Sequence, residues 1–366
     1  METHLQLSSN LSTRSLAAGE LSRAGHTVVA VFLGFILVLG FFCNLLVLVV
    51  FSRFPELRTP TSVLLINISI SDMLVCIFGT TLSFAASVRG RWLTGSYGCQ
   101  WYGFSNALFG LVSLVSLSLL SFDRYSVVLC RAQSDSHSQY RRAKIAVAAS
   151  WLYSLVWTLP PLLGWSSYGP EGPGTTCSVQ WNQRTAVARS YISCLFIFCL
   201  LLPLVLMFFC YWRILLAVRS VVRQATGFSR SLAEWREGRV LAMVVAMVTG
   251  YLLCWMPYGV VAMLASFGRP GVMPLAASLI PSLLAKASTV LNPVIYVLLN
   301  NQFSRCFLHM IRCSSEAPPS PVHLTMPSSS WLRPHNPILP ITSAPLTEEQ
   351  NTEPCMFTSR EQQEQQ

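Results

Sequence analysis

Long apolar runs separated by short polar stretches dominate the chain. Each run holds the ~20 apolar residues needed to cross a ~30 Å hydrocarbon core. Because an open chain cannot leave its backbone polar groups unpaired in lipid, such runs are expected to be helices. The pattern therefore predicts seven transmembrane helices. The runs are Val28–Ser52, Thr59–Val88, Gly98–Phe122, Ile145–Pro170, Ser190–Trp212, Val240–Gly268 and Pro270–Ser304.

The composition supports a membrane protein. Hydrophobic residues make up 52% of the 366 residues and charged residues only 11%, with a mean hydropathy of +0.50, whereas soluble domains carry about a quarter charged residues. We predict an all-α fold, a seven-transmembrane helix bundle with a short amphipathic eighth helix at Asn301–Ile311. Three parts are expected: an extracellular N-terminal segment (1–27), the helical domain (28–313), and a disordered cytoplasmic tail (314–366) rich in Pro, Ser, Thr, Glu and Gln.

The basic residues predict the orientation of the bundle. The first, third and fifth loops contain two, five and six Lys or Arg residues, and the second, fourth and sixth contain two, two and one. Basic loops favour the cytoplasm, so the N-terminus is expected outside a plasma membrane and the C-terminus inside. Asn10 then heads a glycosylation sequon. The net charge of +10 is explained by topology, and nucleic acid is not an expected partner.

Several polar residues interrupt the apolar runs. Asn44, Asp72 and the sequence Asn292-Pro293-Val294-Ile295-Tyr296 lie within them, and Asp123-Arg124-Tyr125 ends the third run. Polar groups inside the membrane need partners and are functional candidates by default. Cys254-Trp255-Met256-Pro257-Tyr258 places a large aromatic residue beside a helix-kinking proline.

Two of the twelve cysteines are expected at the outer face. Cys99 opens the third run and Cys177 lies in the loop after the fourth. A bridge between them would pin that loop over the mouth of the bundle, although sequence alone does not prove the pairing. Most other cysteines lie inside the apolar runs, as packing residues. Cys313, after the amphipathic segment, is a candidate for palmitoylation.

These motifs together resemble the rhodopsin-type G-protein-coupled receptors, over Val28 to Cys313. The resemblance implies that Arg124 pairs with Asp123 and with Glu237, holding the receptor inactive. It further implies that Tyr211 and Tyr296 reposition on opening, with Asn292 and Pro293 part of the same switch. Asn44 and Asp72 correspond to the polar network or sodium site of the family.

Lys286 is the only acidic or basic residue between Pro270 and Ser304, in a chain with two lysines and 23 arginines. Its alternatives are a snorkelling side chain, a buried salt bridge, a cation for an anionic ligand, or a nucleophilic amine. Desolvation favours the neutral, nucleophilic amine. A lysine six residues before Asn-Pro-x-x-Tyr is where opsins attach retinal, so the resemblance implies a retinal Schiff base on Lys286.

A protonated Schiff base needs a counter-charge. When the acidic residues are sorted by predicted topology, only Asp72 and Glu171 remain near the outer half or the bundle interior. Vertebrate visual opsins carry a glutamate three residues after the helix-three cysteine, and here that position is Tyr102. The chain thus resembles opsins that rely on the loop acid. We predict Glu171 as counterion, with Tyr102 assisting it by hydrogen bonding.

Further retinal neighbours follow from the resemblance position by position, each with ordinary bundle packing as the alternative. They are Gly110, Trp181, Trp255, Tyr258 and Ser282.

Stretches such as Asn67-Ile68-Ser69-Ile70-Ser71-Asp72 and Pro161-Leu162-Leu163-Gly164-Trp165 resemble the encephalopsin and multiple-tissue (TMT) opsins. This group implies non-visual photoreception with 11-cis-retinal bound covalently in the dark. It also implies signalling to a heterotrimeric G protein of the Gi/Go class, regulation by arrestin and a receptor kinase through the tail, and contact with membrane lipid. No enzymatic activity is expected.

Three alternatives compete with a signalling opsin. A retinal photoisomerase on the same scaffold is disfavoured by the intact Asp123-Arg124-Tyr125 and Asn-Pro-x-x-Tyr motifs. A microbial-type light-driven ion pump would need carboxylates in the third helix, and Gly98–Phe122 has none. A receptor for a diffusible ligand would use Lys286 as a pocket cation and form no visible pigment.

Overall fold

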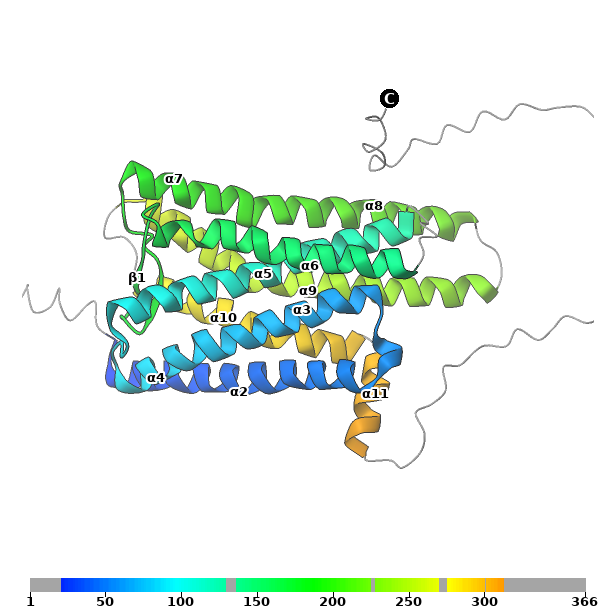
Figure 1. Ribbon diagram of the computed structural model, residues 1–366, viewed down its shortest axis with the longest axis horizontal. Helices are drawn as coiled ribbons and strands as arrows, with labels where there is room; N and C mark the ends of the chain where they lie inside the picture. The colour runs from blue at the N-terminus through cyan, green and yellow to red at the C-terminus, as the bar shows by residue number, and fades with distance from the viewer. Residues whose placement is uncertain (1–20, 130–135, 225–227, 270–274, 300, 313–366) are drawn as a thin grey trace, which may run out of the picture. The chain divides into compact units, whose positions relative to one another are not determined.

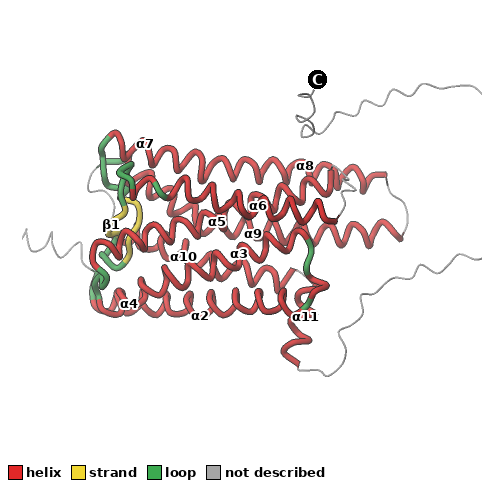
Figure 2. The backbone as a smooth tube through the Cα atoms, in the orientation of Figure 1, coloured by secondary structure: helices red, strands yellow, loops and turns green. Residues whose placement is uncertain are grey.

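The computed structural model describes residues 21–129, 136–224, 228–269, 275–299 and 301–312. Within these residues seven helical segments are long and apolar enough to cross a membrane. They pack side by side as one bundle, and a short helix lies across one of its ends (Figures 1 and 2). The predicted fold class is confirmed.

The first three spans are bounded by local signals in the sequence. Helix α2 (Arg23–Arg53) begins after Ser22, whose hydroxyl accepts from the Gly25 amide. Helix α3 (Pro60–Val75) begins with a capping box between Thr59 and Ser62. It continues through a π-helical turn η2 (Cys76–Thr80) into α4 (Thr81–Arg89), and α5 (Gly95–Leu129) is the third span. A 3₁₀ turn, η1 (Pro55–Leu57), joins α2 to α3.

The fourth span begins and ends earlier in the sequence than predicted. Helix α6 (Ser136–Thr158) stops before Pro160 and Pro161, which form a 3₁₀ turn, η3 (Pro160–Leu162). Prolines lack the N–H that would continue the helical hydrogen bonds. The apolar run predicted to reach Pro170 therefore mixed a helix with part of an outer loop.

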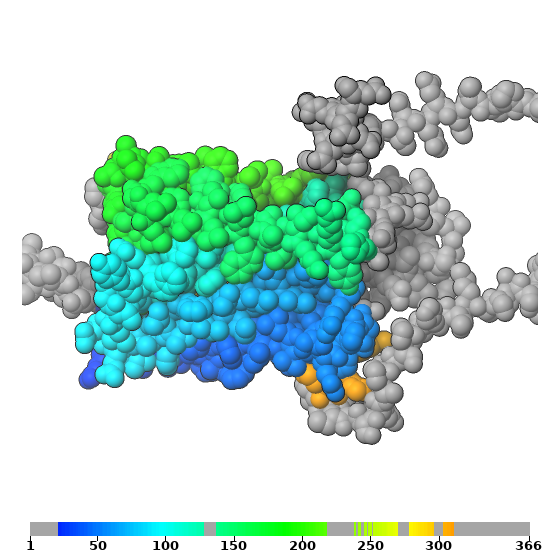
Figure 3. Space-filling view, viewed as in Figure 1, coloured from blue at the N-terminus to red at the C-terminus, as the bar shows by residue number. Residues whose placement is uncertain are grey.

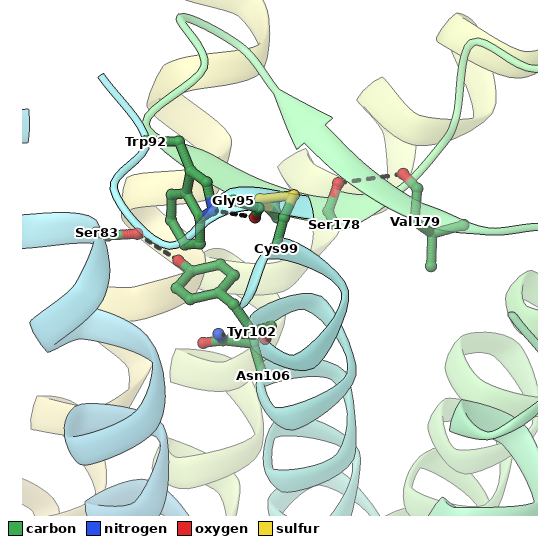
Figure 4. Close-up of a disulfide and its surroundings, with 9 residues drawn as sticks. Ser83, Trp92, Gly95, Cys99, Tyr102, Asn106, Ser178 and Val179 are labelled. Atoms are coloured by element: carbon green, nitrogen blue, oxygen red, sulfur yellow. Dashed lines mark hydrogen bonds between the residues drawn. A yellow bond between two sulfur atoms is a disulfide. The ribbon is translucent and has the colours of Figure 1, made fainter. Parts of the chain in front are cut away.

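That loop contains a β-hairpin, which the apolar pattern did not predict. Strand β1 (Tyr168–Glu171) pairs antiparallel with β2 (Thr176–Val179), and Glu171 lies opposite Thr176. A disulfide joins Cys177 of β2 to Cys99 at the start of α5, with the two Cα atoms 5.5 Å apart. Figure 4 shows this bridge holding the hairpin against the end of α5. The candidate disulfide is confirmed.

The remaining spans complete the bundle. The fifth is α7 (Ala186–Cys194), a π-helical segment η4 (Leu195–Leu201) and α8 (Leu202–Gln224); the sixth is α9 (Phe228–Phe267) and the seventh α10 (Leu275–Leu299). The predicted amphipathic segment is α11 (Asn301–Arg312). Its Phe303 is fully buried and its ring contacts that of Phe51, which anchors α11 to the bundle.

Apolar side chains cover the outward faces of the spans. On α6, for example, Leu152 is 66% and Val156 58% exposed, and Figure 3 shows the α6 residues on the near surface of the bundle. Polar residues face inward instead: Asn44 and Ser150 are fully buried. An apolar outer surface with the polar residues turned inward is typical of a multi-pass membrane protein.

Candidate functional site

A cavity of about 220 Å³ lies inside the bundle, next to the hairpin. Residues of α3, α5, α6, β1, β2, α7, η4, α9 and α10 line it, and most of them are apolar. Lys286 is the only Lys or Arg among the described residues that line the cavity, and the acids are Asp72 and Glu171. An apolar pocket with few convergent polar groups is the usual form of a small-molecule site.

Lys286 projects from the middle of α10 into this cavity. Its Nζ lies 5.9 Å from the centroid of the Tyr102 ring, within range of a cation–π contact. Ser282, one turn away on α10, is buried and lines the same cavity. The lysine therefore does not reach toward either end of the helix, which argues against the snorkelling alternative.

Glu171 enters the cavity from β1 and is held by a chain of hydrogen bonds. The Tyr258 hydroxyl donates to Glu171 Oε2 at 3.2 Å, and Trp181 Nε1 donates to the Tyr258 oxygen at 3.2 Å. The Ser266 hydroxyl donates to the Trp181 carbonyl at 3.0 Å. Trp181, Tyr258 and Glu171 therefore form one connected group, rather than three independent neighbours of a ligand.

The surroundings of Glu171 shift the pKa of its carboxyl group in two opposite directions. Burial raises its pKa above the ordinary value, while the charge of Lys286 and hydrogen bonds with Ser178, Tyr258 and Trp181 lower it. Among the described residues, the one ion pair with N and O within 4.0 Å is Arg124–Asp123. Glu171 and Lys286 thus interact across the cavity, without direct contact.

Tyr102 differs from its predicted role. Its hydroxyl hydrogen bonds to Ser83 of α4, as Figure 4 shows, and its ring faces Lys286. We predicted that Tyr102 would assist Glu171 by hydrogen bonding. In this structure Tyr258 holds that position, because the Tyr102 hydroxyl is directed toward Ser83 of α4.

Gly110 and Trp255 form the inner wall of the cavity. A Cβ added at Gly110 would lie 3.1 and 3.2 Å from two ring atoms of Trp255, so glycine allows the indole to approach α5. Trp255 Nε1 donates to the Ser288 hydroxyl at 3.1 Å. The predicted cavity residues Gly110, Trp255, Tyr258, Trp181 and Ser282 are all brought together here.

Sequence reasoning missed several polar residues around the cavity, among them Asn106, Ser178, Ser288 and Thr289. Asn106 was detectable, because an asparagine inside a charge-free transmembrane run is as costly as Asn44. The three hydroxyl residues give no such signal, since Ser and Thr are common in loops and helices alike and often bond to nearby backbone.

A second polar group lies deeper, beyond Trp255. Asn292 Nδ2 donates to Asp72 Oδ2 at 2.8 Å. Asn44 Nδ2 donates to the carbonyls of Gly40 and Thr289, each at 2.8 Å. Asp72 and Asn292 are therefore direct partners, whereas Asn44 ties α2 to the backbone of α10, next to Pro293 and the rest of the Asn-Pro-x-x-Tyr motif.

The far end of α5 carries the ion pair predicted from the sequence. Arg124 Nη2 lies 2.6 Å from Asp123 Oδ2, which also accepts from the Thr61 hydroxyl at 2.9 Å. The hydroxyls of Tyr211 and Ser121 are 2.9 Å apart, and the Tyr125 ring contacts that of Phe209. The predicted roles of the Glu237 and Tyr296 side chains, Asn10 and Cys313 lie outside what the structure describes.

Seven apolar spans around a lysine-bearing cavity, with an ion pair at the opposite end of the third span, define a seven-helix membrane receptor. The family 7 transmembrane receptor (rhodopsin family) matches residues 43–296. The chain belongs to this family, and membership implies a heterotrimeric G protein as its partner.

The similar proteins, including one of known structure, are opsins. Pinopsin of Columba livia is 39% identical over 292 residues, covering 80% of this chain and 82% of the relative. Opsin-3 of Mus musculus is 37% identical over 292 residues, covering 79% and 72%. The crystal structure of squid rhodopsin matches with a TM-score of 0.73 and 28% identity, over 81% of this chain and 89% of that one. The predicted resemblance to the opsin group that includes opsin-3 is confirmed.

Proposed function

We propose that this protein is a light-sensing receptor that binds retinal covalently through Lys286, 11-cis in the dark. The observation that carries the proposal is the position of Lys286, the one amine among the described residues that line an apolar cavity, in a chain related to opsins. The Lys286 nitrogen would attack the retinal aldehyde carbon and the aldehyde oxygen would leave as water, giving a Schiff base.

The residues of the cavity fit such a ligand. The lining is mostly apolar, as a polyene requires, and the bare Cα of Gly110 lets the Trp255 ring approach α5. When bound, retinal supplies light absorption and a change of shape, and the protein supplies orientation and charge. Trp255, Tyr258, Trp181, Tyr102 and Ser282 would define the volume around it.

Glu171 is our proposed counterion. Its carboxylate faces the same cavity as Lys286, and the interaction between the two charges lowers the carboxyl pKa. Asp72, the other acid of the cavity, already accepts from Asn292 in the deeper polar group. Charges about 4 Å apart at an effective dielectric of about 20 attract by about 4 kcal/mol, and a longer separation lowers this figure in proportion.

The opposite end of the bundle would couple light to signalling. The Asp123–Arg124 pair, braced by Thr61, supports an inactive state that opens when the helices move apart. We propose a G protein of the Gi/Go class, with arrestin and a receptor kinase acting on the tail. The proposed setting is the plasma membrane, with the hairpin end outside and the tail in the cytoplasm. The same ion pair favours signalling over a retinal photoisomerase, which has no need of it.

The test is a dark absorption spectrum of purified protein regenerated with 11-cis-retinal. We expect a visible band for the natural protein, no pigment for Lys286→Ala, and an ultraviolet band for Glu171→Gln. Lys144→Ala is the matched control, because Lys144 is the only other lysine and lies on α6 outside the cavity. Borohydride reduction followed by mass spectrometry should locate the adduct on Lys286.

Each outcome separates the candidate functions. If folded protein forms no pigment with retinal, the opsin proposal fails and a receptor for a diffusible ligand takes its place. A pigment that isomerises retinal on illumination but never activates a G protein would favour the photoisomerase.

A further inference from the structure

Asn106 presents an unpaired amide oxygen next to the cavity. It lies on α5 one turn from Tyr102, and its Nδ2 donates to the Tyr102 carbonyl at 2.8 Å. Among the described residues its Oδ1 has no hydrogen-bond partner, while the side chain lines the cavity. Figure 4 shows Asn106 below Tyr102 on α5. An amide oxygen that faces a mostly apolar cavity without a protein donor is free to accept a hydrogen bond from a ligand.

The position of this amide is built into the neighbouring helix. A Cβ added at Gly79 would lie only 2.0 Å from Asn106 Oδ1 and 2.7 Å from its Cγ. Gly79 belongs to the π-helical turn η2, which interrupts the second span at this level. Any other residue at 79 would displace the amide, so the glycine and the π-turn together make room for it.

Two sets of contacts place the amide near Lys286 along the bundle axis. Cys76 of η2 lies 3.8 Å from the Thr289 hydroxyl, which donates to the Lys286 carbonyl. The second and seventh spans run antiparallel. One helical turn from the Cys76–Thr289 contact toward the hairpin, the second span therefore reaches Gly79 and the seventh span reaches Lys286. From the other side, the Tyr102 ring faces Lys286 Nζ, and Asn106 is one turn from Tyr102 on the same face of α5.

We propose that Asn106 is a positioning and tuning residue for the retinal linkage, with its amide oxygen acting as a second, neutral partner for the Lys286 nitrogen beside the charged Glu171. The inference rests on the proposed attachment of retinal to Lys286. It assigns to Gly79 the supporting role of keeping the amide in place. The other titratable side chains that line the cavity are Asp72, Tyr102, Glu171, Tyr191, Cys199 and Tyr258.

The physical effect has a definite direction. A protonated linkage carries its positive charge near the nitrogen in the dark, and light excitation moves that charge along the polyene. A negative dipole end beside the nitrogen stabilises the dark state more than the excited state, so it widens the energy gap. Removing the amide should therefore move absorption to longer wavelengths. A carboxylate in its place would act more strongly, because a full charge replaces a dipole.

Absorption spectra of four variants test this inference. We expect Asn106→Ala to absorb at longer wavelength than the natural protein. Gly79→Ala, which keeps Asn106 but displaces its amide, should shift the band in the same direction. The sharpest case is the double variant Glu171→Gln with Asn106→Asp, which should regain the visible band that Glu171→Gln alone loses. Ser105→Ala is the matched control, since Ser105 is buried on α5, bonds to the Trp101 carbonyl and does not line the cavity.

Thermal unfolding of each variant without retinal checks that it is folded. The inference is overturned if folded Asn106→Ala and Gly79→Ala absorb like Ser105→Ala and if Asn106→Asp does not restore the band of Glu171→Gln. Failure of the proposed function has a different signature, since then the natural protein itself forms no pigment.

Discussion

Tyr258 reaches from α9 to the hairpin and donates a 3.2 Å hydrogen bond to Glu171. The same helix carries Trp255 three residues earlier, against Gly110 and Ser288. One helix therefore contacts both the loop acid and the inner wall of the cavity. Movement of α9 would change the surroundings of the carboxylate and of the indole together, which links events in the cavity to the far end of the bundle.

Replacing Tyr258 by Phe should raise the pKa of Glu171 further. The hydroxyl stabilises the carboxylate, and without it burial dominates more strongly. The pH at which Glu171 takes up a proton and the absorption of the pigment changes should then be higher. Absorption spectra recorded across pH measure this midpoint. Tyr140→Phe is the control, because the Tyr140 hydroxyl bonds to the Arg58 carbonyl at the other end of the bundle; equal midpoints in the two variants would contradict the assignment.

Without retinal, Glu171 should make stability depend on pH. Its pKa is raised above the ordinary carboxyl value of 4.5. Below 4.5 both the folded and unfolded states hold the proton, so the contribution to stability is fully present. As pH rises through the folded-state pKa the buried carboxylate becomes charged and that contribution is lost. Melting temperatures measured across this window should fall, and they should fall less for Glu171→Gln. Parallel curves would show that other groups cause the dependence.

Gly110→Ala should destabilise the protein by about 1–3 kcal/mol, as is typical of overpacking. The new methyl group would lie 3.1 Å from the Trp255 ring, and relief requires the indole to move away from its Ser288 partner. Thermal unfolding measures the loss. In Gly238→Ala, where an added Cβ has no neighbour within 4 Å, we expect no loss. Similar melting temperatures for both variants would mean that Gly110 and Trp255 are not tightly packed against each other.

Loss of the disulfide should lower the free energy of unfolding by about 2–5 kcal/mol, the usual range for removing a native bridge. The bridge joins residues 78 apart in sequence and fixes β2 to α5. Cys99→Ala should therefore lower the melting temperature and also weaken the visible band, because Glu171 is carried by the same hairpin. Cys194→Ala, which removes a free cysteine, is the control. An unchanged band in folded Cys99→Ala would show that Tyr258 alone positions the hairpin acid.

Asp123→Asn should raise G-protein activation in the dark. The Asp123 and Arg124 side chains are 33% and 21% exposed, and partly exposed ion pairs contribute about 1 kcal/mol or less, so the rise should be at most about fivefold. Nucleotide exchange on the G protein without illumination measures it. Glu56→Gln removes a negative charge at the same end, from an exposed residue without an ion pair in the described structure. Equal dark activity in the two variants would argue against the Asp123–Arg124 pair as a latch.

The membrane spans could be predicted because each depends on the composition of one segment, and the prediction was wrong where composition is ambiguous. A segment must be apolar for about twenty residues to cross a bilayer, and this requirement is visible without any tertiary contact. The predicted end of the fourth span was wrong because the residues after Pro160 are also apolar, although they lead into a hairpin that covers the mouth of the bundle. Apolar composition does not distinguish residues buried in lipid from residues buried against other protein.

The sequence by itself determined the seven spans, the amphipathic helix, the isolated Lys286 and the set of acids available to it, because each depends on composition along one segment. Only the tertiary structure decided that Tyr258 rather than Tyr102 holds Glu171, and that Gly79 makes room for the Asn106 amide. Those relationships join segments far apart in the chain, and the direction of a side chain in a bundle is set by helix rotation and by neighbouring side chains.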